Sequence, residues 1–157
     1  MRFGQTRQNR AGAAFAPTKG MKEPSAKRQR TLALHERALR FSNSVISSCP
    51  ERFSGMPSSR VWDQLIRAAD STSNNLIEAD GASSDADFLN KMSIALREAN
   101  ESRAALMKVR VCALDNSRKV DDLNLESEAG QLAAIFATII LKMRLRLEEE
   151  ARKRKQK

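Results

Sequence analysis

The sequence has few of the residues that build metal, redox or catalytic sites. Its 157 residues include one histidine, His35, and two cysteines, Cys49 and Cys112, that lie far apart. A zinc site or a disulfide framework needs close pairs of such residues, and a di-metal site needs Glu-x-x-His pairs, which do not occur here. We therefore expect no metal, no cofactor and no catalytic residue, and we interpret both cysteines as reduced, half-buried thiols.

Aromatic residues and long apolar runs are also scarce. The chain has no tyrosine, one tryptophan and six phenylalanines, mostly at core spacing, which leaves no aromatic platform of the kind that reads single strands. No apolar run approaches the roughly 18 residues that span a bilayer, and no Gly-rich phosphate loop or nucleophile elbow is present. These absences predict a soluble, cytoplasmic protein that is not an enzyme and does not contact a membrane.

Helical periodicity is what the sequence has in abundance. In residues 85–113, large residues at both ends and small ones in the middle recur at steps of 4 and 3, a spacing typical of a seam between packed helices. The members of this seam are Phe88, Met92, Ala95, Ala99, Ser102, Leu106 and Val109. With similar stripes over residues 31–48, 59–80 and 122–150, the pattern predicts an all-α, antiparallel up-down-up-down four-helix bundle in residues 31–150.

Local signals predict where these helices end. Cys49-Pro50 should stop the first helix, since a residue before proline avoids helical geometry. Ser84 with Asp87 three residues later is typical of a capping box for the third helix. The polar run from Asp115 to Asp122 is expected to be the last loop.

The formal net charge of +9 belongs to the ends of the chain. Residues 1–30 carry +7, residues 31–141 carry −3 and residues 142–157 carry +5. We expect residues 1–30 to be a disordered basic tail and residues 151–157 to be a basic C-terminal tail. Clusters of this kind can bind nucleic-acid phosphates or can simply be solvated. The candidates are Lys27, Arg28, Arg30, Arg152, Lys153, Arg154, Lys155 and Lys157.

The first 30 residues allow two further interpretations. An acid-free stretch that contains Arg2, Arg7 and Phe15 resembles a transit peptide. Met21, about ten residues before the first predicted helix, is an alternative start to Met1.

The two central helices also carry polar residues where a plain core helix would carry leucine. Ser71, Asn75 and Glu78 share one side of the second helix, and Glu98, Glu101 and Ser102 can face them from the third. Three interpretations remain open: a polar site, a hydrogen-bond network that fixes helix register, or a surface that joins protomers.

These segments resemble a known family. Gln64, Arg67, Ser71, Asn75, Glu78, Phe88-Leu89 and the run from Ile94 to Ser102 are similar to four-helix-bundle proteins encoded in ribosomal-RNA intervening sequences. The resemblance covers about residues 31–147. It departs at Ala79, where the family usually has glycine, and at Ala104 and Ala105, where aromatic residues are frequent. The motif residues that form its polar network are Arg67, Ser71, Asn75, Glu78, Glu98, Glu101 and Ser102.

The resemblance implies partners. Its superfamily includes the accessory variability protein of diversity-generating retroelements, a basic pentameric bundle that binds a reverse transcriptase and nucleic acid. It therefore implies a homo-oligomer, a pentamer, with RNA or DNA and a reverse transcriptase as partners. Our preferred hypothesis is a nucleic-acid-associated accessory protein of this kind. The alternative is an intervening-sequence-type oligomeric scaffold that does not bind nucleic acid directly.

Overall fold

The structure is a computed structural model that describes residues 23–51 and 58–156. Within these ranges it contains five α-helices and no strand. They are α1 (Ala26–Ser48), α2 (Ser59–Asp80), α3 (Asp85–Val111), α4 (Ser117–Asp122) and α5 (Leu125–Lys155). The predicted disordered tail falls, for residues 1–22, outside the described residues, as does Lys157.

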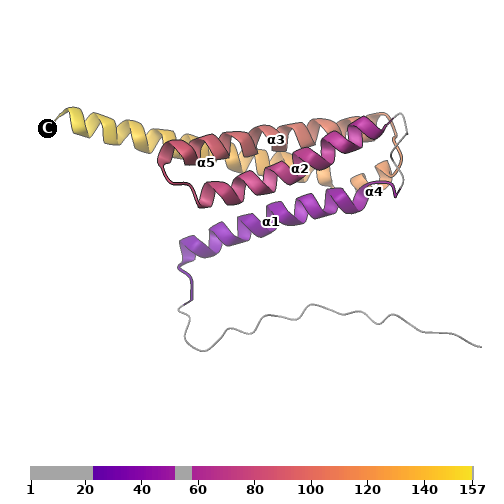
Figure 1. Cartoon of the computed structure of the whole chain (residues 1–157), viewed down its shortest axis with the longest axis horizontal. Helices are drawn as coiled ribbons and strands as arrows, with labels where there is room; N and C mark the ends of the chain where they lie inside the picture. Colours follow the sequence, from indigo (N-terminus) through magenta and orange to yellow (C-terminus); the bar gives the residue numbers. More distant parts are fainter. Residues whose placement is uncertain (1–22, 52–57, 157) are drawn as a thin grey trace, which may run out of the picture.

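The four long helices lie side by side as the predicted all-α bundle (Figure 1). α3 is the central helix because it packs along both α2 and α5, whereas α1 rests mainly on α2 and contacts α5 only sparsely. The short α4 lies at the end of the bundle where α1 finishes. At the opposite end lie the start of α1, the α2–α3 turn and the outgoing C-terminal part of α5 (Figure 1).

The seam predicted for the third helix forms the middle of the core. Ala95 and Ala99 are fully buried, so their small side chains let neighbouring helix axes approach closely. Leu106 and Val109 fill the seam at one end, but Phe88 at the other end stays half-buried. The periodicity therefore predicted the buried face correctly except at this aromatic residue.

Two of the predicted helix ends are confirmed. α1 ends at Ser48, directly before Cys49-Pro50. The Ser84 hydroxyl accepts a hydrogen bond from the Asp87 amide at 3.1 Å, which is the predicted cap of α3. Asp87 in turn accepts from the Ser83 amide at 3.2 Å, so the α2–α3 turn is closed from both sides.

The predicted start of the first helix was wrong. α1 begins at Ala26 instead of residue 31, and the side chain of Ser25 accepts a hydrogen bond from the Arg28 amide. Serine is a preferred N-cap because its oxygen satisfies an amide that has no partner inside the helix. Residues 26–30 are therefore helical, and Lys27, Arg28 and Arg30 are presented on a helix.

The predicted last loop also contains a helix. α4 occupies Ser117–Asp122, and α5 begins at Leu125 instead of residue 122. The side-chain amide of Asn116 donates to the Ser48 backbone carbonyl at 3.1 Å, and the Lys119 ammonium donates to the Ser47 backbone carbonyl. This segment thus binds carbonyls that α1 leaves without partners at its C-terminal end.

A bidentate ion pair joins α1 to α5. Arg37 Nε lies 2.6 Å from Glu128 Oε1, and Arg37 Nη2 lies 2.8 Å from Glu128 Oε2. The hydrogen bond from Arg37 holds the pKa of Glu128 below its ordinary value, against the opposing effect of burial. The pair fixes the register of the two helices, which share few other contacts.

Candidate nucleic-acid interface

The two basic clusters, which stand at opposite ends of the sequence, lie at the same end of the bundle. The start of α1 carries Lys27, Arg28 and Arg30, and the last turn of α5 carries Arg152, Lys153, Arg154 and Lys155. α5 runs past the other helices and extends away from the bundle at this end (Figure 1). We call this set of residues, with Lys142, Arg144 and Arg146 on the same part of α5, the basic end.

The last turns of α5 form a helical arm. The sequence was expected to be a tail from residue 151 onward, but the helix continues to Lys155. Its residues Glu148–Lys155 include many good helix formers, and cations in the last turn interact favourably with the negative end of the helix dipole. The arm therefore holds its four cations in a defined helical array.

Acidic residues of the α2–α3 turn neutralise part of the basic end. Arg28 pairs with Asp80, and Arg146 Nη2 lies 3.0 Å from Asp85 Oδ1. Arg146 also approaches Glu150 at 3.6 Å on its own helix. Among the described residues, the other cations of the basic end form no ion pair. They are Lys27, Arg30, Lys142, Arg144, Arg152, Lys153, Arg154 and Lys155.

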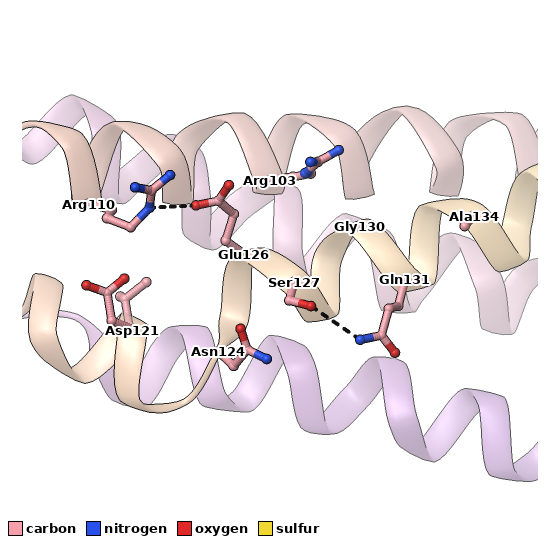
Figure 2. Close-up of a pocket in the computed structure, with 10 residues that line it drawn as sticks. Arg103, Arg110, Asp121, Asn124, Glu126, Ser127, Gly130, Gln131 and Ala134 are labelled. Carbon is pink, nitrogen blue, oxygen red and sulfur yellow. Dashed lines mark hydrogen bonds and ion pairs between the residues drawn. The ribbon is translucent and has the colours of Figure 1, made fainter.

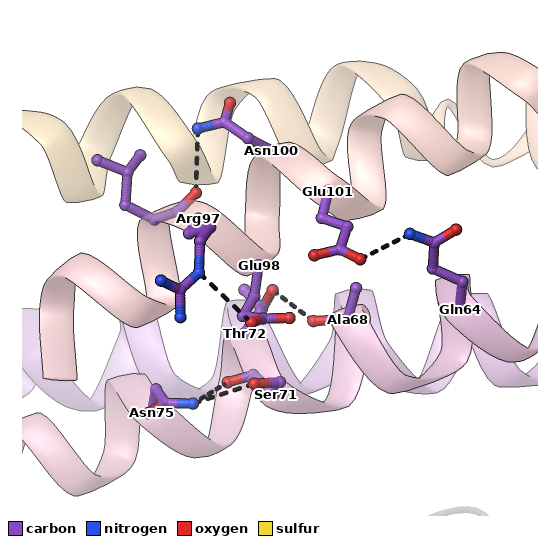
Figure 3. Close-up of polar contacts among 10 residues, drawn as sticks. Gln64, Ala68, Ser71, Thr72, Asn75, Arg97, Glu98, Asn100 and Glu101 are labelled. Carbon is purple, nitrogen blue, oxygen red and sulfur yellow. Dashed lines mark hydrogen bonds and ion pairs between the residues drawn. The ribbon is translucent and has the colours of Figure 1, made fainter.

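The polar residues of α2 do not form one buried network with those of α3. The Asn75 amide donates to the Ser71 carbonyl at 2.9 Å and to its hydroxyl at 3.1 Å, both on α2. Figure 3 shows these two residues on the side of α2 away from Glu98 and Glu101. Arg67 pairs with Asp63 one turn earlier at 2.7 Å.

Two polar side-chain contacts do connect α2 with α3. The Gln64 amide donates to Glu101 at 2.7 Å (Figure 3), and Lys91 lies 2.5 Å from Glu78. Burial, together with the nearby charge of Glu101, raises the pKa of Glu98. Of the seven motif residues, only Glu78 and Glu101 therefore form a hydrogen bond or ion pair with the other helix.

Ser102 is the exception because it is fully buried. Its hydroxyl has no hydrogen-bond partner within the described part of the chain. The buried hydroxyls of Thr72, which sequence reasoning overlooked, and of Ser73 donate to the Ala68 and Asp70 carbonyls. Backbone carbonyls of the same helix thus satisfy these two buried hydroxyls of α2, which need no partner from α3.

A surface hollow between α3, α4 and α5 is lined by charged side chains of both signs. Arg110 Nε lies 2.9 Å from Glu126 Oε2, and Asp121 lies on the same rim (Figure 2). Arg103 extends across Gly130 of α5, and a side-chain carbon at Gly130 would meet the Arg103 side chain at ordinary contact distance. The charges of its two arginines and two carboxylates cancel, so this hollow does not favour an anionic ligand.

The remaining candidates are the two cysteines and possible metal ligands. Cys49 is half-buried, and burial raises the pKa of its thiol to about 11. Cys112 is exposed, so the prediction of a half-buried thiol was wrong there. In residues 23–51 and 58–156, no three His, Cys, Asp or Glu side chains are grouped as for a metal ion. The helices in these ranges are too polar or too short to cross a membrane.

Known proteins resemble this chain in sequence and in fold. The sequence profile of the 23S rRNA-intervening sequence proteins matches residues 30–136. A crystal structure of a protein with unknown function, from the S23 ribosomal protein family of Bacteroides thetaiotaomicron, has a similar fold. It has a TM-score of 0.57 and 22% identity, covering 71% of this chain and 97% of that one. No curated protein matches. The cluster Arg152–Lys155 lies beyond the matched residues.

Proposed function

The chain belongs to the family of 23S rRNA-intervening sequence proteins, and we propose that it is a non-enzymatic accessory protein that binds nucleic acid at its basic end. One observation carries the proposal. Lys27 and Arg30 at the start of α1, and the cluster Arg152–Lys155 on the α5 arm, lie at one end of the bundle without ion pairs among the described residues. Two clusters at one end can contact phosphates of the same strand.

The chemistry of this end favours binding to phosphates over reading of bases. Lysine and arginine side chains displace the counterions that surround nucleic acid, and contacts of this kind position a protein without selecting a sequence. The arm presents its cations along a helix, which fits a phosphate backbone without requiring a deep pocket. We therefore expect RNA and DNA of many sequences to bind, with affinities that fall steeply as salt rises.

Charge-neutral variants test this proposal in the full chain. In one variant Arg152, Lys153, Arg154 and Lys155 are replaced by Gln, and in a second Lys27 and Arg30 are replaced by Gln. The control matched to the second variant replaces Lys108 of α3 and Arg118 of α4 by Gln. Both residues are exposed at the opposite end of the bundle. Fluorescence anisotropy with labelled RNA and DNA is expected to show weaker binding for both end variants and unchanged binding for the control. A control that loses as much affinity as the Lys27 and Arg30 variant, which removes the same number of charges, would mean that only net charge matters.

A second candidate function is an oligomeric scaffold, which the surface of α1 favours. Leu32, Leu39 and Ile46 are each exposed by 37–48%, and because they stand seven residues apart they share one face of the helix. Such a stripe fits a contact between copies of the chain. Leu39→Lys should lower the sedimentation coefficient if copies meet there. A reverse-transcriptase partner stays a prediction from the resemblance, and co-purification of the two proteins tests it.

A further inference from the structure

A groove opens at the basic end between the start of α1, the α2–α3 turn and α5. Its volume is about 730 Å³, within the range of sites that hold small ligands. Its apolar lining comes from α1, α2, α3 and α5 and includes Leu34, Phe88, Met92, Ile139 and Met143. We call it the end groove.

The end groove exists because α1 packs on α2 and contacts α5 only sparsely. As a result Leu34, Phe88 and Ile139 remain half-buried, although all three stand at the core positions of their helices. Apolar surface left in water is a site where a ligand gains free energy by covering it. Phe88 supplies the aromatic part of this surface.

The rim of the end groove carries three cations, Lys27, Lys142 and Arg146, and two carboxylates, Asp80 and Asp85, so its formal charge is positive. Lys27 of α1 and Lys142 of α5 line the groove and form no ion pair among the described residues. Arg146 also lines it but is paired with Asp85. A ligand that suits this arrangement combines a flat apolar face with negative charge on either side of it.

An unstacked nucleobase and its two flanking phosphates have this combination, and the groove is continuous with the basic end. A base in a duplex has its faces covered by its neighbours, so only a single strand can offer one. We propose that the end groove holds an unstacked base of a single-stranded nucleic acid, with Phe88 against the base and Lys27 and Lys142 near the phosphates. This inference rests on the proposed function and names its ligand class.

Composition alone predicts no aromatic platform for single strands, because tyrosine and tryptophan are scarce. In the proposed arrangement, the half-buried Phe88 would supply a single aromatic ring for one base. Stacking on one aromatic side chain tolerates any base and contributes about 5- to 150-fold in affinity per base. The expected result is a preference for single strands without a preference for sequence.

The test compares a single-stranded oligonucleotide with the duplex of the same sequence at one salt concentration. The wild-type chain should bind the single strand at least about fivefold more tightly. Phe88→Leu keeps an apolar side chain but removes the aromatic ring, so it should reduce that preference without changing duplex affinity. The control is Leu145→Ala, since Leu145 is 50% exposed on α5 and does not line the groove. Circular dichroism checks that both variants fold.

Three results would overturn the inference. If Phe88→Leu binds single strands as tightly as the wild type, no base lies in the groove, and an acidic apolar segment of a protein would be the better candidate. If both variants lose affinity equally, the effect is not local to the groove. In either case, duplex binding that still depends on the basic end would leave the proposed function standing. If neither single strands nor duplexes bind at low salt, the proposed function and this inference both fail.

Discussion

Arg28 at the start of α1 forms an ion pair with Asp80 at the end of α2, 52 residues away in the sequence. With the Arg146–Asp85 pair at 3.0 Å, it places two acidic residues of the α2–α3 turn against two cations of the basic end. These carboxylates occupy positions that phosphates would otherwise take. They therefore act as internal competitors of any nucleic acid that binds there.

Removing both competitors should strengthen nucleic-acid binding. The double variant Asp80→Asn with Asp85→Asn frees two cations, so the slope of log affinity against log salt should steepen by up to about 1.8 on duplex DNA. The control is Asp121→Asn with Asp122→Asn, which changes net charge equally at the opposite end of the bundle. If the two double variants gain the same affinity, the turn does not compete.

The small waist of α3 should not tolerate a larger side chain. Ala99 is fully buried, so Ala99→Leu overpacks the seam and should lower the free energy of unfolding by about 1–3 kcal/mol. Ala104 is exposed on the same helix, and Ala104→Leu should change the free energy of unfolding by less than about 0.5 kcal/mol. Urea denaturation measures both. Equal midpoints would show that Ala99 is not at a helix contact.

Replacing Ser102 with alanine should stabilise the fold. Its buried hydroxyl lacks a partner in the described residues, so Ser102→Ala removes an unsatisfied group and should raise the free energy of unfolding by about 1 kcal/mol. Ser73→Ala is the matched comparison, because Ser73 is equally buried but donates to the Asp70 carbonyl at 2.9 Å. A loss of stability in Ser102→Ala would mean that its hydroxyl is satisfied, for example by water.

The Arg37–Glu128 pair should make stability depend on pH in the acid range. Because Arg37 lowers the pKa of Glu128 in the folded chain, the pair stabilises the fold above the unfolded pKa of about 4.3. That contribution is lost as pH falls through the folded value. Glu128→Gln should therefore cost about 0.5–1 kcal/mol at neutral pH and much less at low pH.

The control for this pair is Glu36→Gln, which removes an exposed carboxylate lying 3.7 Å from Arg40. Its thermal midpoint should change little at either pH. A cost for Glu128→Gln that is the same at neutral and acid pH would show that packing, not charge, is responsible.

The sequence predicted those parts of the fold that depend on local pattern. The burial of Ala95, Ala99 and Leu106 follows from their spacing, and the cap at Ser84 follows from its position before Asp87. Elements that depend on tertiary contacts were not predictable. α4 was missed because Asn116 and Lys119 bind carbonyls of α1, a contact that no local signal encodes.

The candidate site was predictable in composition but not in arrangement. The basic clusters are evident in the sequence, whereas their convergence depends on the length of α5 and on the direction of α1 (Figure 1). The early start of α1 was missed because Pro24 and Ser25 stand in a stretch whose composition resembles a tail. The half-buried position of Phe88 depends on the sparse contact between α1 and α5, which periodicity alone cannot indicate.

The most direct test of the central claim is the salt dependence of duplex DNA binding by the full chain and by one combined variant. In that variant Lys27, Arg30 and Arg152–Lys155 are all replaced by Gln. Each phosphate contact contributes about 0.9 to the slope of log affinity against log salt, so the slope should become shallower by several units and the affinity at low salt should fall. An unchanged slope and affinity would contradict the account, because nucleic acid would then bind elsewhere on the chain.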